Sequence, residues 1–512
     1  MAFAERHPRT PALGTGLIGA GLPIVAFLFA TGAVFVALRM FKGPMLMGGL
    51  VLIAVMAVLW TRPERATQAG IFALYLNLGG LLVSYHNEES LLVSMMTFAL
   101  LALPFGVALL HLWFAEHKGI LADSTLGYML LYWSALALSA VMSNDPGNSV
   151  RKLTTYTLEG VVLYFLVVNV VRSGDVLRKC LWALVLSGAL LGALSTVQVA
   201  TKSYNNTFGG LAKVQRVELE GNTESASKLD HPRVAGSLGE TNRYGQLMVV
   251  LLPIALFLAK SESVPALKWI AAFSCLPILA GVLLTGSRGA AVTVLLVVLS
   301  VAALGHLRWT HIAGVAAAGV LLAAILVPQF AQRLSTLSAL TEVPKGRATS
   351  MDSSLRQRAT IVLATARIFR DNPVFGVGPG QARLYVERYS EGGLTRITRT
   401  RRGHNLYLEE LANTGLVGFS FFALVVASVV RRLVRLRRSL LHVDSQAAYL
   451  ATALLMAIVA YLISAMFLHL SYERYFWVLI ALGSAATMVL RGEERTLQVA
   501  PLQEPYVSYV PR

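Results

Sequence analysis

Residues 446–468 read QAAYLATALLMAIVAYLISAMFL, and none of these 23 side chains carries a formal charge. About 20 apolar residues in a helix cover the roughly 30 Å hydrocarbon core of a bilayer. Lipid offers the backbone no hydrogen-bond partners, so a spanning segment must bond its own amide and carbonyl groups as a helix. This stretch therefore predicts a membrane-spanning helix.

Segments of the same kind recur along the 512-residue chain, of which 55 % is hydrophobic and 14 % is charged. Typical soluble domains carry about 25 % charged residues, so the composition excludes a soluble enzyme and a disordered chain. Both cysteines, Cys180 and Cys275, lie in apolar runs, which excludes a disulfide scaffold. We predict an all-α polytopic membrane protein with about 12 transmembrane helices, in a range of 12–14. The candidate spans lie near 14–38, 44–60, 68–84, 91–113, 126–143, 154–171, 177–199, 243–259, 266–283, 289–305, 312–328, 406–430, 446–468 and 474–490.

These spans and the loops between them divide the chain into regions. We expect N-terminal transmembrane helices in 1–120, a central transmembrane region in 121–328, a long basic loop in 329–405, C-terminal transmembrane helices in 406–490 and a cytoplasmic tail in 491–512. The central region contains a further outer loop at about 200–242.

The charge balance has two explanations. Forty-four Lys and Arg against 27 Asp and Glu give a net charge of +17, which in a soluble protein would suggest nucleic-acid binding. In a membrane protein, basic residues instead mark the cytoplasmic loops, and we expect no nucleic-acid partner. A linker expected after 406–430 holds Arg431, Arg432, Arg435, Arg437 and Arg438. By alternation Arg62, Arg65, Arg172 and Lys179 share its side, and the loops 200–242 and 329–405 face outward as periplasmic loops.

The 329–405 loop carries 13 basic and five acidic side chains, a net charge of +8 on the side that short loops keep poor in cations. We expect a helix capped by Ser353-Ser354 that runs to about Arg370 and is stopped by Asn372-Pro373. The sequence Gly376-Val377-Gly378-Pro379-Gly380 predicts a tight, exposed turn. The alternative is an amphipathic helix that only lies at the membrane interface.

A histidine stands where this loop enters the span 406–430. His404 precedes Asn405, and helical spacing places it on one face with Gly415 and Gly418, where small residues leave room for a neighbouring helix. The ordinary pKa of imidazole suits proton removal near neutral pH, so His404 is a candidate general base. The alternative is an interfacial histidine that anchors the helix end.

Arginines occur at the same expected interface. Arg288 lies in Thr285-Gly286-Ser287-Arg288-Gly289 at the outer end of a span, and Arg233 and Arg243 flank a glycine-rich turn. The planar guanidinium fork suits phosphate oxygens better than an ammonium group does. Simple anchoring of the helix end by Arg288 and an ordinary flexible loop at 233–243 are the alternatives. Together with His404, these side chains suggest a site for a lipid-linked diphosphate.

One spacing resembles a known family. His404-Asn405, nine residues, Gly415, two residues and Gly418 form the signature of the bacterial O-antigen ligase family, which is related to O-antigen polymerases and protein O-oligosaccharyltransferases. The runs TGSRGA at 285–290 and RATIVLATARIFRDNPVFGVGPG at 358–380 also resemble it, although Val362 stands where many relatives have Trp. The resemblance covers roughly 120–490.

The resemblance implies a multi-pass glycosyltransferase of the bacterial inner membrane in lipopolysaccharide biosynthesis. It would transfer O-polysaccharide from undecaprenyl diphosphate to a sugar of the lipid A–core at the periplasmic face, without a metal or cofactor and with inversion. His404 would be the base, Asn405 would orient the histidine or a sugar, and the diphosphate would meet arginines. The expected diphosphate-binding residues are Arg288, Arg233, Arg243, Arg358 and Arg356.

Other functions fit the same features. An O-antigen polymerase or a protein O-oligosaccharyltransferase would use the same donor with another acceptor. A lipid or polysaccharide transporter is less favoured, because transporters concentrate polar residues near the bilayer midplane, whereas the charges here gather at one interface.

Overall fold

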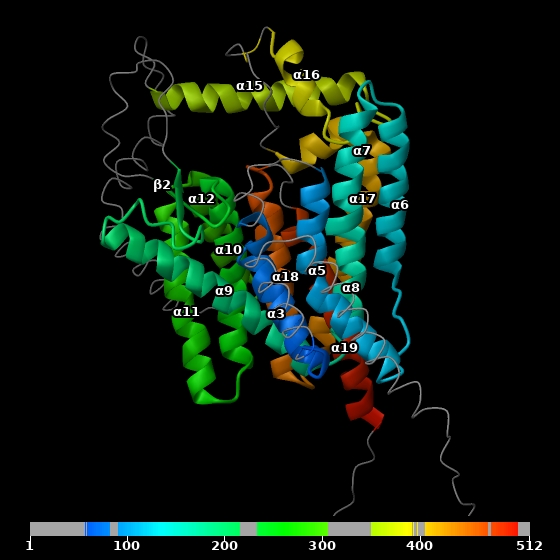
Figure 1. Ribbon diagram of the computed structural model, residues 1–512, viewed down its shortest axis with the longest axis vertical. Helices are drawn as coiled ribbons and strands as arrows, with labels where there is room; N and C mark the ends of the chain where they lie inside the picture. The colour runs from blue at the N-terminus through cyan, green and yellow to red at the C-terminus, as the bar shows by residue number, and fades with distance from the viewer. Residues whose placement is uncertain are drawn as a thin grey trace, which may run out of the picture.

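The computed structural model describes residues 57, 59–81, 91–215, 233–305, 350–391, 393, 397, 405–468 and 473–499. Long helices stand side by side in this part of the chain, and one helix lies across their upper end (Figure 1). The helices are α3 (Pro63–Tyr75), α5 (Leu91–Phe114), α6 (Ser124–Val141), α7 (Pro146–Thr155), the π-helix η1 (Tyr156–Val162), α8 (Leu163–Val170), α9 (Gly174–Ala200), α10 (Thr241–Ser261), α11 (Pro265–Leu284), α12 (Arg288–Ala303), α15 (Ser350–Asp371), α16 (Ala382–Tyr389), α17 (Leu406–Leu440), α18 (Ser445–Ser464) and α19 (Glu473–Val499). Strands β1 (Lys213–Gln215) and β2 (Arg233–Gly236) form a small antiparallel ribbon.

Eight helices among the described residues are long and apolar enough to cross a membrane, which confirms a helical, polytopic membrane protein. They are Ser124–Val141, Pro146–Val170, Gly174–Ala200, Thr241–Ser261, Pro265–Leu284, Leu406–Leu440, Ser445–Ser464 and Glu473–Gly492. The expected spans near 14–38 and 312–328, with most of 44–60, lie outside the described residues. In place of the span near 68–84, α3 has only 13 residues. The total of about 12 spans stays a prediction.

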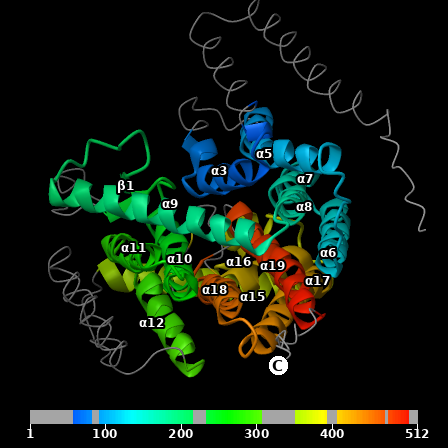
Figure 2. The same cartoon turned by 90° about the horizontal axis from the view of Figure 1, so that it is seen from below.

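The core of the bundle lies around α10, α18 and α19, the spans with the largest buried share. Helix α18 packs on both α10 and α19, and these three helices also pack on α9, α11 and α17. Seen from below, α9 runs across the bundle between α11 and α3 (Figure 2). Rings from α6, η1, α17 and α19 contact one another in the interior: Tyr132, Tyr156, Phe422, Phe476 and Trp477.

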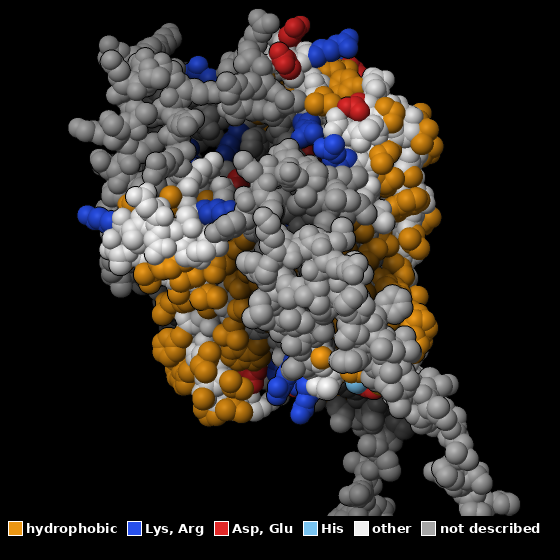
Figure 3. All heavy atoms as spheres, in the orientation of Figure 1, with side chains coloured by type: hydrophobic (Ala, Val, Ile, Leu, Met, Phe, Trp, Pro, Cys, Tyr) orange, Lys and Arg blue, Asp and Glu red, His pale blue; other side chains and the backbone are white. Residues whose placement is uncertain are grey.

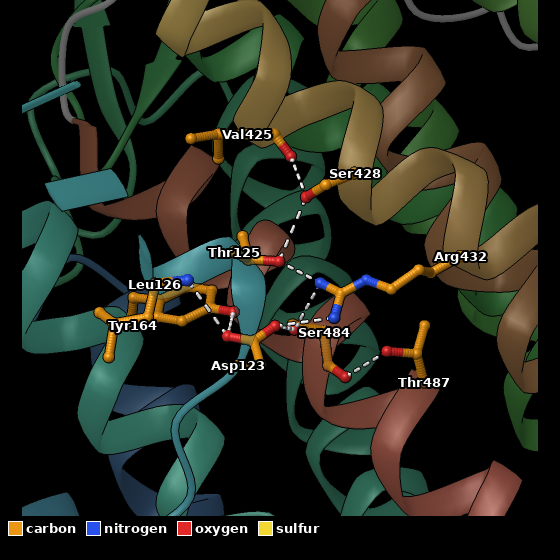
Figure 4. Close-up of polar contacts among 9 residues, drawn as sticks. All are labelled: Asp123, Thr125, Leu126, Tyr164, Val425, Ser428, Arg432, Ser484 and Thr487. Carbon is orange, nitrogen blue, oxygen red and sulfur yellow. Dashed lines mark hydrogen bonds and ion pairs between the residues drawn. The ribbon is translucent and has the colours of Figure 1, made fainter. Parts of the chain in front are cut away.

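Charged side chains fasten the lower end, which we define by Asp123 and Arg432. Asp123 caps α6, and Arg432 on α17 donates to its carboxylate at 2.8 Å (Figure 4). Ser484 on α19 and Tyr164 on α8 also donate to it, at 2.6 and 2.7 Å. Burial alone would raise the pKa of Asp123, but the hydrogen bonds from Ser484, Tyr164 and Arg432 outweigh it and lower that pKa to about 2. Four helices are therefore joined at one carboxylate.

The expected linker after 406–430 is wrong, because α17 continues to Leu440. Arginine is a good helix former, and a helix keeps Arg432 in reach of its buried carboxylate partner while Arg435 and Arg438 stay exposed. The basic cluster therefore lies on the last turns of a helix rather than in a loop. The contact of Arg432 with Asp123 places this cluster at the lower end, and the membrane face that it meets stays a prediction.

We define the upper end by α15 and α16. The predicted start of α15 is wrong. Helix α15 begins at Ser350, so Ser353-Ser354 lie inside the helix and do not cap it. Its end at Asp371, just before Asn372-Pro373, is as predicted. Its buried side chains, Ile361, Ala364 and Ile368, pack with α16 and with Ala412 of α17 as a separate small core.

The glycine-rich segment after α15 is not an exposed turn. Residues 377–379 are buried, because the chain lies against a break in α17 at Gly415, whose φ is 63° and ψ is −166°. Amides of Leu416 and Val417 donate to the carbonyls of residues 373 and 374 at 2.8 and 3.2 Å. Amides of residues 377 and 378 donate back to α17 carbonyls, each at 3.0 Å. The space left by Gly415 is filled by this segment, not by a neighbouring helix.

Candidate functional site

His404, the expected base, lies outside the described residues, but the structure fixes the chain immediately after it. The Asn405 side-chain oxygen accepts the Leu408 amide at 3.1 Å and so caps α17. The Leu406 amide donates to the Ala465 carbonyl at 2.9 Å, and the Tyr407 hydroxyl donates to α18 at 2.7 Å. The start of α17 is thus tied to the end of α18.

Residues 465–467, which follow α18, contact the start of α12 as well. Ser287 caps α12, which makes Arg288 its first residue. A Cβ on Gly289 would lie 3.2 Å from Cβ of Phe467, two residues beyond Ala465. Ser464 on α18 also donates to Thr293 on α12 at 3.3 Å. Arg288 and Asn405 therefore stand on two helix ends that flank residues 465–467, although 117 positions separate them in sequence.

Two further predicted arginines approach Arg288. Arg233 on β2 donates through Nε to the Thr285 carbonyl at 2.8 Å, just before the α12 cap. Arg358 on α15 lies near enough that the charge of Arg288 acts on it: burial lowers the pKa of the Arg358 guanidinium from its ordinary value, and Arg288 lowers it further. We name Arg233, Arg288 and Arg358 the upper arginine group. Three separate segments supply it, and all three side chains are partly exposed.

Like charges brought together repel each other, and an anion placed among them removes that cost. A diphosphate offers several oxygens to several guanidinium forks at once. The upper arginine group is therefore electrostatically suited to a multiply charged phosphate ligand.

The structure places the other predicted arginines apart from this group. Arg243 is 2 % exposed, donates to Gln246 at 3.3 Å and lies 3.9 Å from Glu240. It lines a small internal cavity with Tyr75, Tyr461 and Tyr475 among others. Arg356 is exposed and, two positions before Arg358, leaves α15 from a different face. Binding of a substrate by either residue stays a prediction.

Sequence reasoning missed a set of buried ion pairs near the start of α19. Arg474 donates to Glu159 of η1 at 2.8 Å and to Asn77 at 2.5 Å. Lys152 of α7 pairs with Glu473. Charges inside the apolar runs 154–171 and 474–490 were the available signal, since such residues are costly in a membrane unless they are paired.

Glu410 belongs to the same polar region. It is 5 % exposed and accepts a hydrogen bond from the Tyr132 hydroxyl at 2.7 Å, which joins α17 to α6. It lines a small cavity with Lys152, Asn413 and Glu473 beneath residues 379–380 of the upper end. These contacts give Glu410 a structural role at the junction of α17 and α6. No group of three or more His, Cys, Asp or Glu side chains able to hold a metal ion occurs within the described parts of the chain.

Comparison with known proteins adds one finding. Residues 273–423 match the family described as O-antigen ligase. The matched region runs from within α11 to within α17 and contains Arg288, Arg358, His404 and Asn405, whereas Arg233 and Arg243 precede it. No curated protein matches the chain. The match confirms the resemblance that the His-Asn-x9-Gly-x-x-Gly spacing indicated.

Proposed function

We propose that this chain is an O-antigen ligase, because residues 273–423 match the family of that description, whose members are membrane enzymes that transfer glycans. It moves O-polysaccharide from undecaprenyl diphosphate to a sugar hydroxyl of the lipid A–core. The upper end faces the periplasm, and the cation-bearing lower end faces the cytoplasm of the inner membrane.

The observation that carries this proposal is the upper arginine group. Arg233, Arg288 and Arg358 come together from β2, α12 and α15 beside the helix end that follows His404. The donor diphosphate lies against these guanidinium groups. Its prenyl chain extends along the apolar surface of the spans, and its polysaccharide projects beyond the upper end.

The proposed reaction is a single displacement with inversion at the anomeric carbon. His404 accepts the proton of the acceptor hydroxyl, and the acceptor oxygen forms the new bond to the anomeric carbon. The bond from that carbon to the diphosphate oxygen breaks, and undecaprenyl diphosphate leaves with the electron pair. The arginines stabilise the negative charge that develops on the leaving group, so the displacement requires neither a metal nor a cofactor.

A reconstituted assay tests this proposal. Purified protein in liposomes receives lipid-linked O-polysaccharide and rough lipopolysaccharide without added metal. We expect polymer to appear on the lipid A–core and free undecaprenyl diphosphate to be released in equal amount. Extension of the lipid-linked chain would instead identify a polymerase, and transfer to a protein hydroxyl would identify an O-oligosaccharyltransferase.

A further inference from the structure

A charged cavity lies at the lower end, which is the end opposite the upper arginine group. It has a volume of about 520 Å³, within the range of roughly 300–1,000 Å³ that is usual for ligand sites. The start of α3, the end of α5 and the start of α9 enclose it. Its charged lining residues are Arg62, Glu64, Arg65, Glu116, Lys118, Arg172 and Lys179.

The acids of this lower cavity are already engaged by its lysines. Lys179 lies 2.5 Å from Glu64 and 2.5 Å from Asp175 on its own helix. Lys118 lies 2.7 Å from Glu116. Five lining cations face three carboxylates when Asp175 is counted, so the cavity keeps an excess of two positive charges.

None of the three arginines meets a carboxylate among the described residues. Arg62 and Arg65 are exposed at the rim. Arg172 lies deeper and is held by neutral oxygens, donating to the carbonyls of Asn169 and Gly119 at 2.7 Å each. The Asn169 side chain in turn accepts the Leu121 amide at 2.7 Å. Arg172 is thus fixed in the wall of the cavity while its charge is unbalanced.

The cavity opens where the apolar surface of the spans ends. Trp113 and Phe114, on the last turn of α5, are 48 % and 40 % exposed, and their rings lie 5.0 Å apart. Exposed aromatic side chains at the end of an apolar helix, such as 101–114, are typical of the boundary between hydrocarbon and head groups. Figure 3 shows Lys and Arg side chains at the lower end, beside a hydrophobic surface. An anion that enters here at the membrane surface can keep an apolar tail beside α5.

We propose that the lower cavity binds the phosphate head group of an anionic phospholipid. The phosphate lies between Arg62, Arg65 and Arg172, and the acyl chains lie along the exposed residues of α5. A soluble phosphate ester would use the same guanidinium groups but would gain nothing from the apolar surface. The site is independent of the proposed transferase activity, and it requires no assignment of the membrane face.

Lipid titration of the purified, delipidated protein tests this proposal. We expect phosphatidylglycerol to bind at least tenfold more tightly than phosphatidylethanolamine by native mass spectrometry. The double variant Arg62→Gln/Arg65→Gln should weaken phosphatidylglycerol binding about tenfold to thirtyfold, since each basic residue near a membrane surface contributes about a fivefold factor. Both arginines are exposed, so the fold should persist, and the melting temperature of the variant checks this.

The matched control is Arg435→Gln/Arg438→Gln, which removes two exposed arginines from the lower end of α17 without touching the cavity. It should retain binding within about twofold. Equal loss in both double variants, or no loss in the first, would overturn the proposal. Glycerol 3-phosphate that competes at the concentration of the lipid would assign the cavity to a soluble phosphate and overturn the lipid assignment.

Discussion

Gly415 of α17 lies directly against the carbonyl group of Val374, so that a Cβ on Gly415 would come 2.2 Å from that oxygen. Its φ of 63° with ψ of −166° is a backbone conformation open essentially to glycine alone. This contact fixes the segment after α15 onto the helix that begins next to His404. The upper end is therefore built on a helix break.

A side chain at position 415 should loosen that junction. We expect Gly415→Ala to lower the melting temperature by several degrees and to reduce glycan transfer at least tenfold, because backbone strain of about 1–3 kcal/mol adds to a clash with Val374. Thermal unfolding in detergent and the reconstituted assay measure the two effects. Gly106→Ala on α5, where a Cβ meets no atom within 4 Å, is the control and should change neither value. An unchanged Gly415→Ala protein would refute the role of this contact.

Because Asp123 is paired with Arg432 at the lower end, we predict that the stability of the fold depends on pH. Asp123 has a folded pKa of about 2, below its value of about 3.9 in an unfolded chain. Its carboxylate therefore stabilises the fold above pH 4, by about 2–3 kcal/mol, and this contribution is lost as the pH falls from about 4 to 2. Asp123→Asn should lower the melting temperature at pH 7, and the difference from wild type should shrink toward pH 2.

The control for this prediction is Asp371→Asn, which alters an aspartate that is 42 % exposed at the upper end. It should follow the wild-type pH profile. A difference between Asp123→Asn and wild type that stays constant from pH 7 to pH 2 would contradict the assigned pKa.

His404→Ala should abolish transfer while donor binding persists, since the proposed base acts on the acceptor. General-base catalysis contributes roughly 10²–10⁴-fold, so turnover should fall by at least two orders of magnitude. His442→Ala, which changes an exposed histidine just beyond the end of α17, should retain full turnover. Near-normal capping of core with polymer by the His404→Ala protein would rule out this base.

Much of the fold follows from polarity alone. Uncharged runs such as 446–468 predicted spans that the structure contains, because the bilayer imposes one length and one secondary structure on them. The same reasoning from polarity placed the end of α17 too early in the sequence. Arg432 was assigned to a linker by its charge, whereas its partner Asp123 lies 309 positions earlier in the chain.

The sequence was sufficient to select individual residues of the candidate site, but it did not show which of them lie close together. Arg233, Arg288 and Arg358 could each be selected because guanidinium groups at a span end suit phosphate. Their convergence depends on how β2, α12 and α15 pack, and the pairing of Arg474 with Glu159 spans 315 positions, so no local pattern encodes either contact. The burial of Arg243 is a packing result of the same kind.

Donor binding by the upper arginine group is the most direct test of the proposed function. Affinity for undecaprenyl-diphosphate-linked polymer and turnover would be measured with purified wild type, Arg288→Ala, Arg358→Ala and the control Arg370→Ala, whose side chain is 77 % exposed. We predict at least tenfold weaker donor binding and a further loss of turnover of about 10²-fold in the first two variants, with the control unchanged. Wild-type affinity and turnover in both Arg288→Ala and Arg358→Ala would contradict the account.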